Sequence, residues 1–183
     1  MSTATQQLYE QTLVLRAQLG DETAFRELLD LHGPHLHAFA RRMTQSAPHV
    51  AEDLMQEIWI AIYRGLPGLL DVSKFRSWAF RIARDRIFRE YRRRRIPMQA
   101  WETGELEEMP AEIALEPPVD ADELRRGLGA LSPEHREVLL LSFFEEMSYE
   151  EIARVTGSTL GTVRSRIHYA KRALKTALNE KSS

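Results

Sequence analysis

Hydrophobic residues recur every three or four positions along most of this chain, and no segment alternates apolar and polar residues as a half-buried strand would. The pattern therefore predicts an all-α protein. The first predicted helix begins at Asp21, a favourable N-cap, and carries its apolar residues on one face. We expect Gly33 and Pro34 to break this helix, and a second helix to follow because the pattern resumes at Leu36.

Two longer helices are expected next. One covers residues 50–65, after Pro48, and the other covers residues 73–95 and stops before Pro97. In the first of these, the face opposite the apolar one is polar except for Ile60. A single exposed isoleucine is either an ordinary surface residue or part of a protein-binding patch, and the pattern alone favours the ordinary surface residue.

The segment 96–121 breaks the helical pattern. It contains four prolines and seven acidic residues, with no basic residue and little periodicity. Such a composition buries too little apolar surface to order itself, so we expect a flexible acidic linker. The linker separates two small predicted domains, an N-terminal helical bundle over 21–95 and a C-terminal helical bundle over 122–178.

The second predicted domain opens with Leu124, Leu128 and Leu131, which are spaced for one face of a helix, and a clear start of a further helix follows them. Ser132 is a favourable N-cap, Pro133 suits the first turn, and Glu134 places an acid at the positive end of the helix dipole. The run 138–144 is apolar all round, which predicts that it forms the buried centre of this domain.

The end of the chain predicts a helix-turn-helix. Ser148 and Glu151 form a capping-box sequence for a short helix, and Gly157 suits its end. A longer helix then begins after Ser158 or Thr159, either of which can cap it. A short helix, a tight glycine turn and a second helix form the helix-turn-helix arrangement.

Charge is distributed unevenly, although the net charge of the 183 residues is only −2. Residues 74–95 carry ten basic and two acidic side chains, and residues 152–178 carry six basic side chains and no acidic one. Residues 1–73 and 96–151 carry an excess of acidic side chains. Each basic segment is a candidate contact with a polyanion.

The second helix of the helix-turn-helix has an apolar face and a basic one. Val163, Ile167 and Leu174 share the apolar face, whereas cations lie beside and opposite it. Cations on such a helix can reach phosphates and guanine edges in a DNA major groove. The alternative is a solvated basic face on an ordinary bundle helix, but the absence of acids over 27 residues favours DNA binding.

Segment 74–95 mixes its cations with aromatic residues, among them Phe75 and Trp78. Cations attract phosphates irrespective of sequence, and aromatic rings can stack on unpaired bases. The alternative is that the rings belong to the core, which their spacing also allows. We expect most of these rings to be buried and one or two to face nucleic acid.

Several function classes find no support. The chain has no cysteine, no apolar run long enough to span a membrane, and no secretory signal pattern. His32, His35 and His37 invite a metal-site interpretation, but no carboxylate pair follows at ligand spacing. No catalytic triad or phosphate-binding loop is present. We therefore expect no enzyme activity, no cofactor, no metal and no small-molecule substrate.

Four segments, taken in order, resemble a bacterial RNA polymerase sigma factor of the extracytoplasmic-function (ECF) group of the sigma-70 family. They are GDETAFRELL, AEDLMQEIWIAIYRGL, FRSWAFRIARDRIFREYRRRR and LSPEHREVLLLSFFEEMSYEEIARVTGSTLGTVRSRIHYAKRAL. The resemblance implies a cytoplasmic promoter-specificity factor that binds core RNA polymerase and starts transcription of a stress- or signal-responsive regulon. It also implies restraint by an anti-sigma factor.

The resemblance assigns roles to particular residues. It implies that the polymerase clamp and flap are bound, the clamp by Asp53, Gln56, Glu57 and Ile60. It implies that the −10 promoter element is bound by Phe75, Trp78, Arg81, Arg84, Asp85 and Arg89, together with the loop before them. It implies that the −35 element is bound by Thr162, Arg164, Ser165, Arg166, His168, Lys171 and Arg172. The acidic linker would run through the polymerase toward its active-site and RNA-exit channels.

Three residues, at two places in the chain, depart from the family pattern. Asp85 stands where the family commonly has an asparagine that helps to bind a flipped −10 base. A carboxylate cannot donate a hydrogen bond as an amide can, so no particular −10 sequence is predicted. Thr159 and Leu160 replace a frequent proline-containing pair at the start of the −35 helix, which can alter contacts there.

Two alternatives remain open from the sequence. A stand-alone helix-turn-helix repressor or activator would bind specific DNA tightly without polymerase. An adaptor that only titrates a partner protein would show no salt-dependent affinity for DNA, even with polymerase present.

Overall fold

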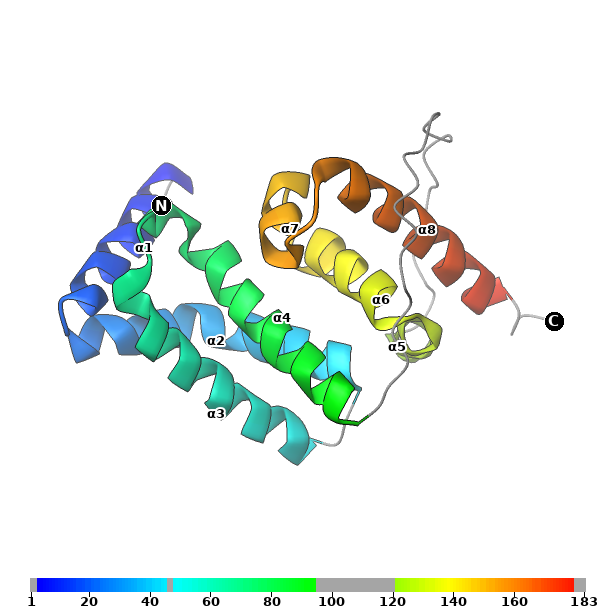
Figure 1. Cartoon of the computed structure of the whole chain (residues 1–183), viewed down its shortest axis with the longest axis horizontal. Coiled ribbons are helices and arrows are strands. Elements are labelled where there is room, and N and C mark those ends of the chain that lie inside the picture. Colours follow the sequence, from blue (N-terminus) through cyan, green and yellow to red (C-terminus); the bar gives the residue numbers. More distant parts are fainter. Residues whose placement is uncertain (1–2, 46–47, 95–120, 180–183) are drawn as a thin grey trace. The chain divides into compact units, whose positions relative to one another are not determined.

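The computed structural model describes residues 3–45, 48–94 and 121–179 (Figure 1). These residues form helices and short turns, and no strand occurs among them, which confirms the predicted all-α class. The predicted linker 96–121 lies outside the described residues except for Ala121, the first residue of a helix. The chain divides into two compact units, Met1–Glu90 and Tyr91–Ser183. The finer domain bounds stay a prediction.

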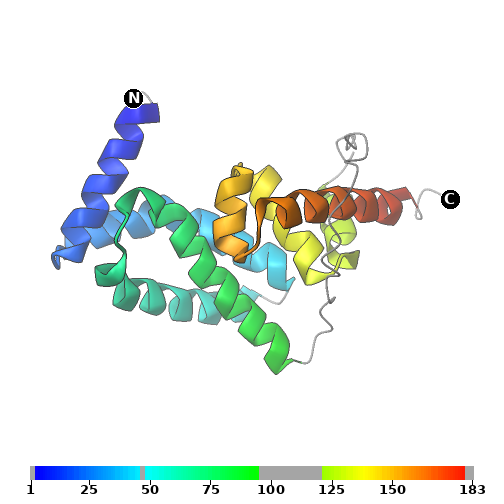
Figure 2. The same cartoon turned by 45° about the horizontal axis from the view of Figure 1, so that its top comes forward.

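The described part of the first unit is built from four α-helices and two short 3₁₀ turns, and the last of these helices continues beyond Glu90. In chain order these are α1 (Thr3–Gln18), α2 (Glu22–Thr44), α3 (Pro48–Gly65), η1 (Leu66–Gly68), η2 (Val72–Lys74) and α4 (Phe75–Arg93). α1 leaves α2 at a steep angle at one end of the unit, as both ribbon views show (Figure 2). The predicted N-cap of α2 is confirmed, because the Asp21 carboxylate accepts from the backbone N–H groups of Thr23 and Ala24.

The predicted break at Gly33 and Pro34 is wrong, because α2 continues through both residues. The buried face on either side of the proline belongs to one continuous helical stripe, which runs through Leu28, Leu36 and Phe39. Pro34 and Asp30, whose carbonyl would accept from the N–H that proline lacks, are both exposed. Burial of the continuous stripe therefore outweighs the loss of one helical hydrogen bond.

Aromatic contacts join the helices of the first unit. The rings of Phe39 in α2 and Phe80 in α4 lie 5.4 Å apart, and the rings of His32 and Phe75 lie 5.1 Å apart. α1, which the sequence pattern did not predict, adds Leu13 and Val14, both fully buried, to this core. α1 is therefore an integral part of the unit.

Among its described residues, the second unit contains four α-helices and a π-helical turn. They are α5 (Ala121–Ala130), α6 (Pro133–Leu139), the π turn (Leu140–Phe144), α7 (Tyr149–Thr156) and α8 (Leu160–Asn179). α8 packs against α5, α6 and α7. Its approach to α5 is close at Gly127, where a Cβ atom would lie 2.9 Å from side-chain atoms of both Leu174 and Leu178.

Arg136 ties the end of α5 to α6. Its guanidinium donates to the carbonyl oxygens of Leu128, Gly129 and Leu131, at 2.7, 3.1 and 3.0 Å. These carbonyls lie where a helix leaves its acceptors without intrahelical partners. One buried cation therefore caps α5.

The prediction that segment 138–144 is buried holds only for its first part. Residues 138–141 are buried, but Phe143 is 48% exposed. The reason is the π turn, in which the N–H of Glu145 donates to the carbonyl of Leu140 at 3.1 Å and shifts the register of the following side chains. Within the described ranges, no helix is long and apolar enough to cross a membrane.

Candidate functional surfaces

The predicted helix-turn-helix is present in α7 and α8. The Ser148 hydroxyl accepts from the N–H of Glu151 at 3.2 Å, and the Glu151 carboxylate accepts from the N–H of Ser148 at 2.9 Å. This reciprocal pair confirms the capping box. Gly157 ends α7 with a φ of 65°, a left-handed conformation that favours glycine.

Threonine hydroxyls organise the start of α8. The Oγ1 of Thr159 accepts from the N–H of Thr162 at 3.2 Å, so Thr159 rather than Ser158 caps the helix. The two threonine hydroxyls lie 2.9 Å apart, and the hydroxyl of Ser165 donates to the carbonyl of Thr162 at 3.0 Å. The start of α8 is therefore fixed by the hydrogen-bonded pair of Thr159 and Thr162.

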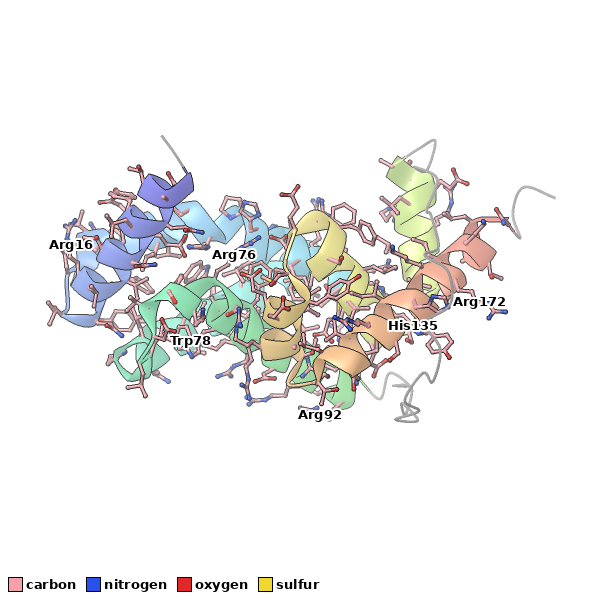
Figure 3. The ribbon with its side chains drawn as sticks, turned by 90° about the horizontal axis from the view of Figure 1, so that it is seen from above. Arg16, Arg76, Trp78, Arg92, His135 and Arg172 are labelled. Carbon is pink, nitrogen blue, oxygen red and sulfur yellow. The ribbon has the colours of Figure 1, made fainter. Side chains whose placement is uncertain are left out.

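α8 presents cations to solvent. Arg164, Arg172 and Lys175 are exposed, and no carboxylate of the described residues lies within ion-pairing distance of them. Arg172 extends away from the ribbon (Figure 3). The ammonium of Lys171 lies 5.3 Å from the centroid of the Phe143 ring. Cations without a neutralising partner on the protein are available to an external anion.

Arg166 points elsewhere. Its Nη1 donates to the hydroxyl of Ser158 at 3.0 Å, across the turn that precedes α8. His135 of α6 is half-buried, and burial lowers the pKa of its imidazole, with a further lowering by the positive charge of Arg166. Arg166 is therefore engaged within the protein and braces the turn.

α4 carries a second cationic face. Helical spacing places the residues of this α4 face on one side, and it consists of Trp78, Arg81, Asp85, Arg89 and Arg92. Arg81 and Arg89 are exposed, and no carboxylate in the described ranges lies within ion-pairing distance of them. Arg84 lies beside this face, with its Nη1 3.5 Å from a carboxylate oxygen of Asp85 and its guanidinium 4.4 Å from the centroid of the Phe88 ring.

The two aromatic residues at the start of α4 differ in exposure. Phe75 has no exposed surface and packs against His32, so it presents no ring to a base in this structure. Trp78 is partly exposed and packs on the end of α3 (Figure 3). A Cβ atom on Gly65 would lie 3.0 Å from its ring, so this packing depends on glycine.

α3 presents an acidic and apolar face. The residues of this α3 face are all exposed and consist of Asp53, Gln56, Glu57, Ile60 and Tyr63. Ile60 is 51% and Tyr63 58% exposed. Phe25 of α2 supports the apolar end, with its ring edge-to-face 5.1 Å from that of Tyr63. Glu57 lies 3.9 Å from Arg86, and its side chain stays 62% exposed. Exposed apolar side chains flanked by charges are typical of a protein-binding surface.

The three histidines predicted not to bind metal do not converge on one site. His32 is buried, with its Nε2 3.3 Å from a carboxylate oxygen of Glu10. Among the residues that the structure describes, no group of three candidate ligands could hold a metal ion.

Comparison with known proteins assigns the chain to a family. Residues 28–96 match the family described as sigma-70 region 2, and residues 121–174 match sigma-70, region 4. The chain is 33% identical over 171 residues to the ECF RNA polymerase sigma factor SigL of Mycobacterium tuberculosis, which covers 90% of this chain and 94% of SigL. The chain belongs to the ECF group of the sigma-70 family. This ECF sigma factor is thus a member of a family of transcription regulators and not of an enzyme family.

Further relatives agree with this assignment. The ECF sigma-E factor of Escherichia coli K12 is 31% identical over 182 residues, which cover 93% of this chain and 94% of that protein. SigE of Mycolicibacterium smegmatis is 35% identical over 174 residues, which cover 90% of this chain and 66% of SigE. The last comparison shows that one relative is considerably longer than the present chain.

Two solved structures share the fold of this ECF sigma factor. CnrH, in complex with the cytosolic domain of CnrY, gives a TM-score of 0.72 at 25% identity and covers 94% of this chain and 98% of CnrH. The sigma factor RpoE of Bartonella quintana, in complex with the anti-sigma factor NepR, gives 0.67 at 25% identity and covers 85% of this chain and 96% of RpoE.

Sequence reasoning missed part of these surfaces. Tyr63 was not among the predicted residues, although it follows Ile60 by three positions and so shares its helical face. Leu70, which is 99% exposed between η1 and η2, was not singled out either. The available signal was the presence of apolar residues on the otherwise polar face of α3.

Proposed function

We propose that this ECF sigma factor acts in the cytoplasm as the promoter-specificity subunit of RNA polymerase, and reads a −35 and a −10 element together. The observation that carries the proposal is the face of α8, where Arg164 and Arg172 stand exposed without an ion-pair partner among the described residues. α8 follows α7, which a capping box begins and Gly157 ends, and a turn that Arg166 holds. A basic helix on a fixed turn suits a DNA major groove.

In this proposal, the start of α8 reads the −35 element. Base edges and phosphates are contacted by Thr162, Arg164, Ser165, His168, Lys171 and Arg172. The helix N-terminus adds its own partial positive charge. Arg166 is left out of the DNA-contacting set because its guanidinium is bonded to Ser158 within the protein.

The α4 face and the loop before it hold the −10 element. Contacts come from Trp78, Arg81, Arg84, Asp85 and Arg89. Phe75 is left out of this set because its side chain is fully buried. Asp85 is 59% exposed and lies 3.5 Å from Arg84, so the guanidinium offsets part of the charge that would otherwise repel phosphate.

The α3 face docks on the clamp of the largest polymerase subunit. Its carboxylates supply charge complementarity to a basic partner, and Ile60 with Tyr63 supplies the apolar centre that such interfaces contain. Segment 122–178 forms the −35 domain and contacts the flap, segment 21–95 forms the −10 domain, and the acidic linker between them runs through the polymerase.

An anti-sigma factor restrains the protein until its signal arrives. The support is the likeness to RpoE, which was solved in complex with the anti-sigma factor NepR. A partner that covers the α3 face or the α8 face would block polymerase or DNA by occupying the same side chains.

In vitro transcription tests the proposal. Purified protein and core RNA polymerase are incubated with restriction fragments of the genome of the source bacterium, and transcripts are mapped at their 5′ ends. We expect transcripts that begin downstream of a shared pair of sequence elements and that disappear without the protein. Absence of such transcripts over the whole fragment set would overturn the proposal.

A further inference from the structure

The side chain of Gln18, the last residue of α1, holds the connection between α3 and α4. Its Nε2 donates to the carbonyl oxygen of Leu66 at 2.9 Å and to that of Leu69 at 2.7 Å. The N–H of Leu69 in turn donates to the carbonyl of Leu66 at 3.1 Å. Gln18 therefore binds both ends of the tight turn that begins this connection.

The rest of the connection has little burial to hold it. Leu66 is buried, but Leu70 is 99% exposed, and the residues from Asp71 to Lys74 are exposed or only partly buried. Its internal hydrogen bonds are local, such as the one from the N–H of Ser73 to the Asp71 carboxylate at 3.0 Å. A segment with few buried contacts opens easily, so hydrogen bonds from another helix weigh strongly on its conformation.

α1 is anchored in the core and holds the backbone of Gln18 in place. Leu13 and Val14 anchor it in the core, and an ion pair of 2.7 Å joins Arg16 to Asp21, the N-cap of α2. The connection between α3 and α4 lies beside the end of α1, as both ribbon views show (Figures 1 and 2). The side chain of Gln18 thus reaches the two carbonyls from a fixed backbone position.

We propose that Gln18 is a positioning residue for −10 recognition: it holds the 66–74 connection in the conformation that receives the −10 element. The inference rests on the proposed function, because it assigns DNA to this connection and to α4. α1 lies before residues 28–96, which match sigma-70 region 2. The side-chain amide that binds the connection therefore comes from outside the matched segment. It links −10 specificity to Gln18, which lies 48 and 51 positions before Leu66 and Leu69.

The test compares three substitutions of Gln18 with one control. Gln18→Met keeps length and helix propensity but removes both donors, Gln18→Glu keeps the shape and offers only acceptors, and Gln18→Lys keeps a donor. Gln7→Met is the control, since Gln7 is an exposed residue of the same helix. Each holoenzyme selects promoters from a library with a randomised −10 element and a constant −35 element, and promoter melting is followed by permanganate reactivity.

We expect the wild type and Gln7→Met to select one sharply defined −10 sequence. Gln18→Lys should retain part of this selectivity. Gln18→Met and Gln18→Glu should melt the selected promoter about five- to tenfold more slowly and accept more −10 sequences, because two hydrogen bonds are lost. Core polymerase affinity should stay within about twofold of the wild type, since the α3 face is unchanged.

A spectroscopic measurement separates positioning from general stability. The chain has no cysteine, so Leu70→Cys gives a single site for a spin label on the free protein. Adding Gln18→Met should increase the mobility of this label while the melting temperature and helical content stay near those of Gln7→Met. If Gln18→Met lowers the melting temperature strongly, the comparison of Gln18→Lys with Gln18→Glu decides, because only the lysine restores a donor.

The outcomes distinguish the two proposals. If the wild-type holoenzyme selects no promoter at all, the proposed function fails. If the wild type selects a sharp −10 sequence, and Gln18→Met and Gln18→Glu select the same sequence with the same melting rate and label mobility, the role of Gln18 is overturned while the proposed function stands.

Discussion

The guanidinium of Arg166 donates a hydrogen bond from Nη1 to the hydroxyl of Ser158 across 3.0 Å, and so ties α8 to the turn that precedes it. Arg164, two positions earlier on the same helix, is exposed and has no ion-pair partner among the described residues. Two arginines of one helix that look equivalent in the sequence therefore have different surroundings. Arg166 holds the turn, whereas Arg164 is available to DNA.

Arg166→Ala should act on stability first. Loss of the bond leaves the Ser158 hydroxyl without this donor and loosens the turn, so we expect the free energy of unfolding to fall by about 1–2 kcal/mol. DNA affinity should fall by a similar factor for all −35 sequences. Thermal unfolding followed by circular dichroism and binding to a panel of −35 variants check this. Unchanged stability together with altered sequence preference would show that Arg166 reads bases.

Arg164→Ala should act on DNA alone. Removal of an exposed cation leaves the fold intact but removes a contact to phosphate or guanine, which typically costs about 1–3 kcal/mol of binding. We expect weaker promoter binding by the holoenzyme, mainly through the −35 element, with an unchanged melting temperature. Binding at several salt concentrations measures it, and Gln7→Met is a neutral control. An equal loss on templates with and without a −35 element would contradict the prediction.

Stability should depend on the protonation of His135. Burial, and secondly the charge of Arg166, lower the pKa of its imidazole in the folded protein below the usual 6.5. The unfolded chain then binds the proton more readily, so this contribution to stability is complete above about pH 6.5 and is lost as the pH falls through the lower folded value. Melting temperatures of the wild type and His135→Gln, measured between pH 7.5 and 5 as a function of pH, check this. Equal slopes for the two proteins would refute it.

Glu57→Ala and Asp53→Ala should separate binding from folding. Both carboxylates are exposed, and the pair of Glu57 with Arg86 spans 3.9 Å, so stability should change by less than about 1 kcal/mol. Core polymerase affinity should fall about fivefold or more if these carboxylates face the clamp. Fluorescence anisotropy with labelled protein measures the affinity, and Glu22→Ala on exposed α2 surface is the control. An affinity equal to that of the control would place the polymerase surface elsewhere.

The sequence predicted the parts of the fold that are encoded locally. The caps at Asp21, Ser132 and Ser148 and the left-handed Gly157 all depend on residues within a few positions of each other. α1 escaped prediction because its apolar residues lie on two sides: Leu13 is buried, whereas other leucines of the helix face solvent. A helix without a single apolar face shows no clear amphipathic period.

Features that depend on tertiary contacts could not be predicted. The run of α2 through Pro34 depends on packing that the local sequence does not contain. The contacts of Arg166 with Ser158 and of Gln18 with Leu66 depend on how helices and turns meet, and residue type alone is compatible with exposure or engagement. The sequence therefore located the candidate surfaces, and the structure sorted the residues that face outward from those that hold the fold.

The central claim is that this protein reads a promoter at two points and needs core polymerase to do so. Binding to a labelled promoter fragment, obtained from the transcription experiment, is measured with and without core polymerase at one salt concentration. We predict weak binding of the protein alone with little sequence preference, and a tight complex with polymerase that is lost when either the −35 or the −10 element is changed. Tight and sequence-specific binding by the protein alone, unchanged by polymerase, would contradict the account.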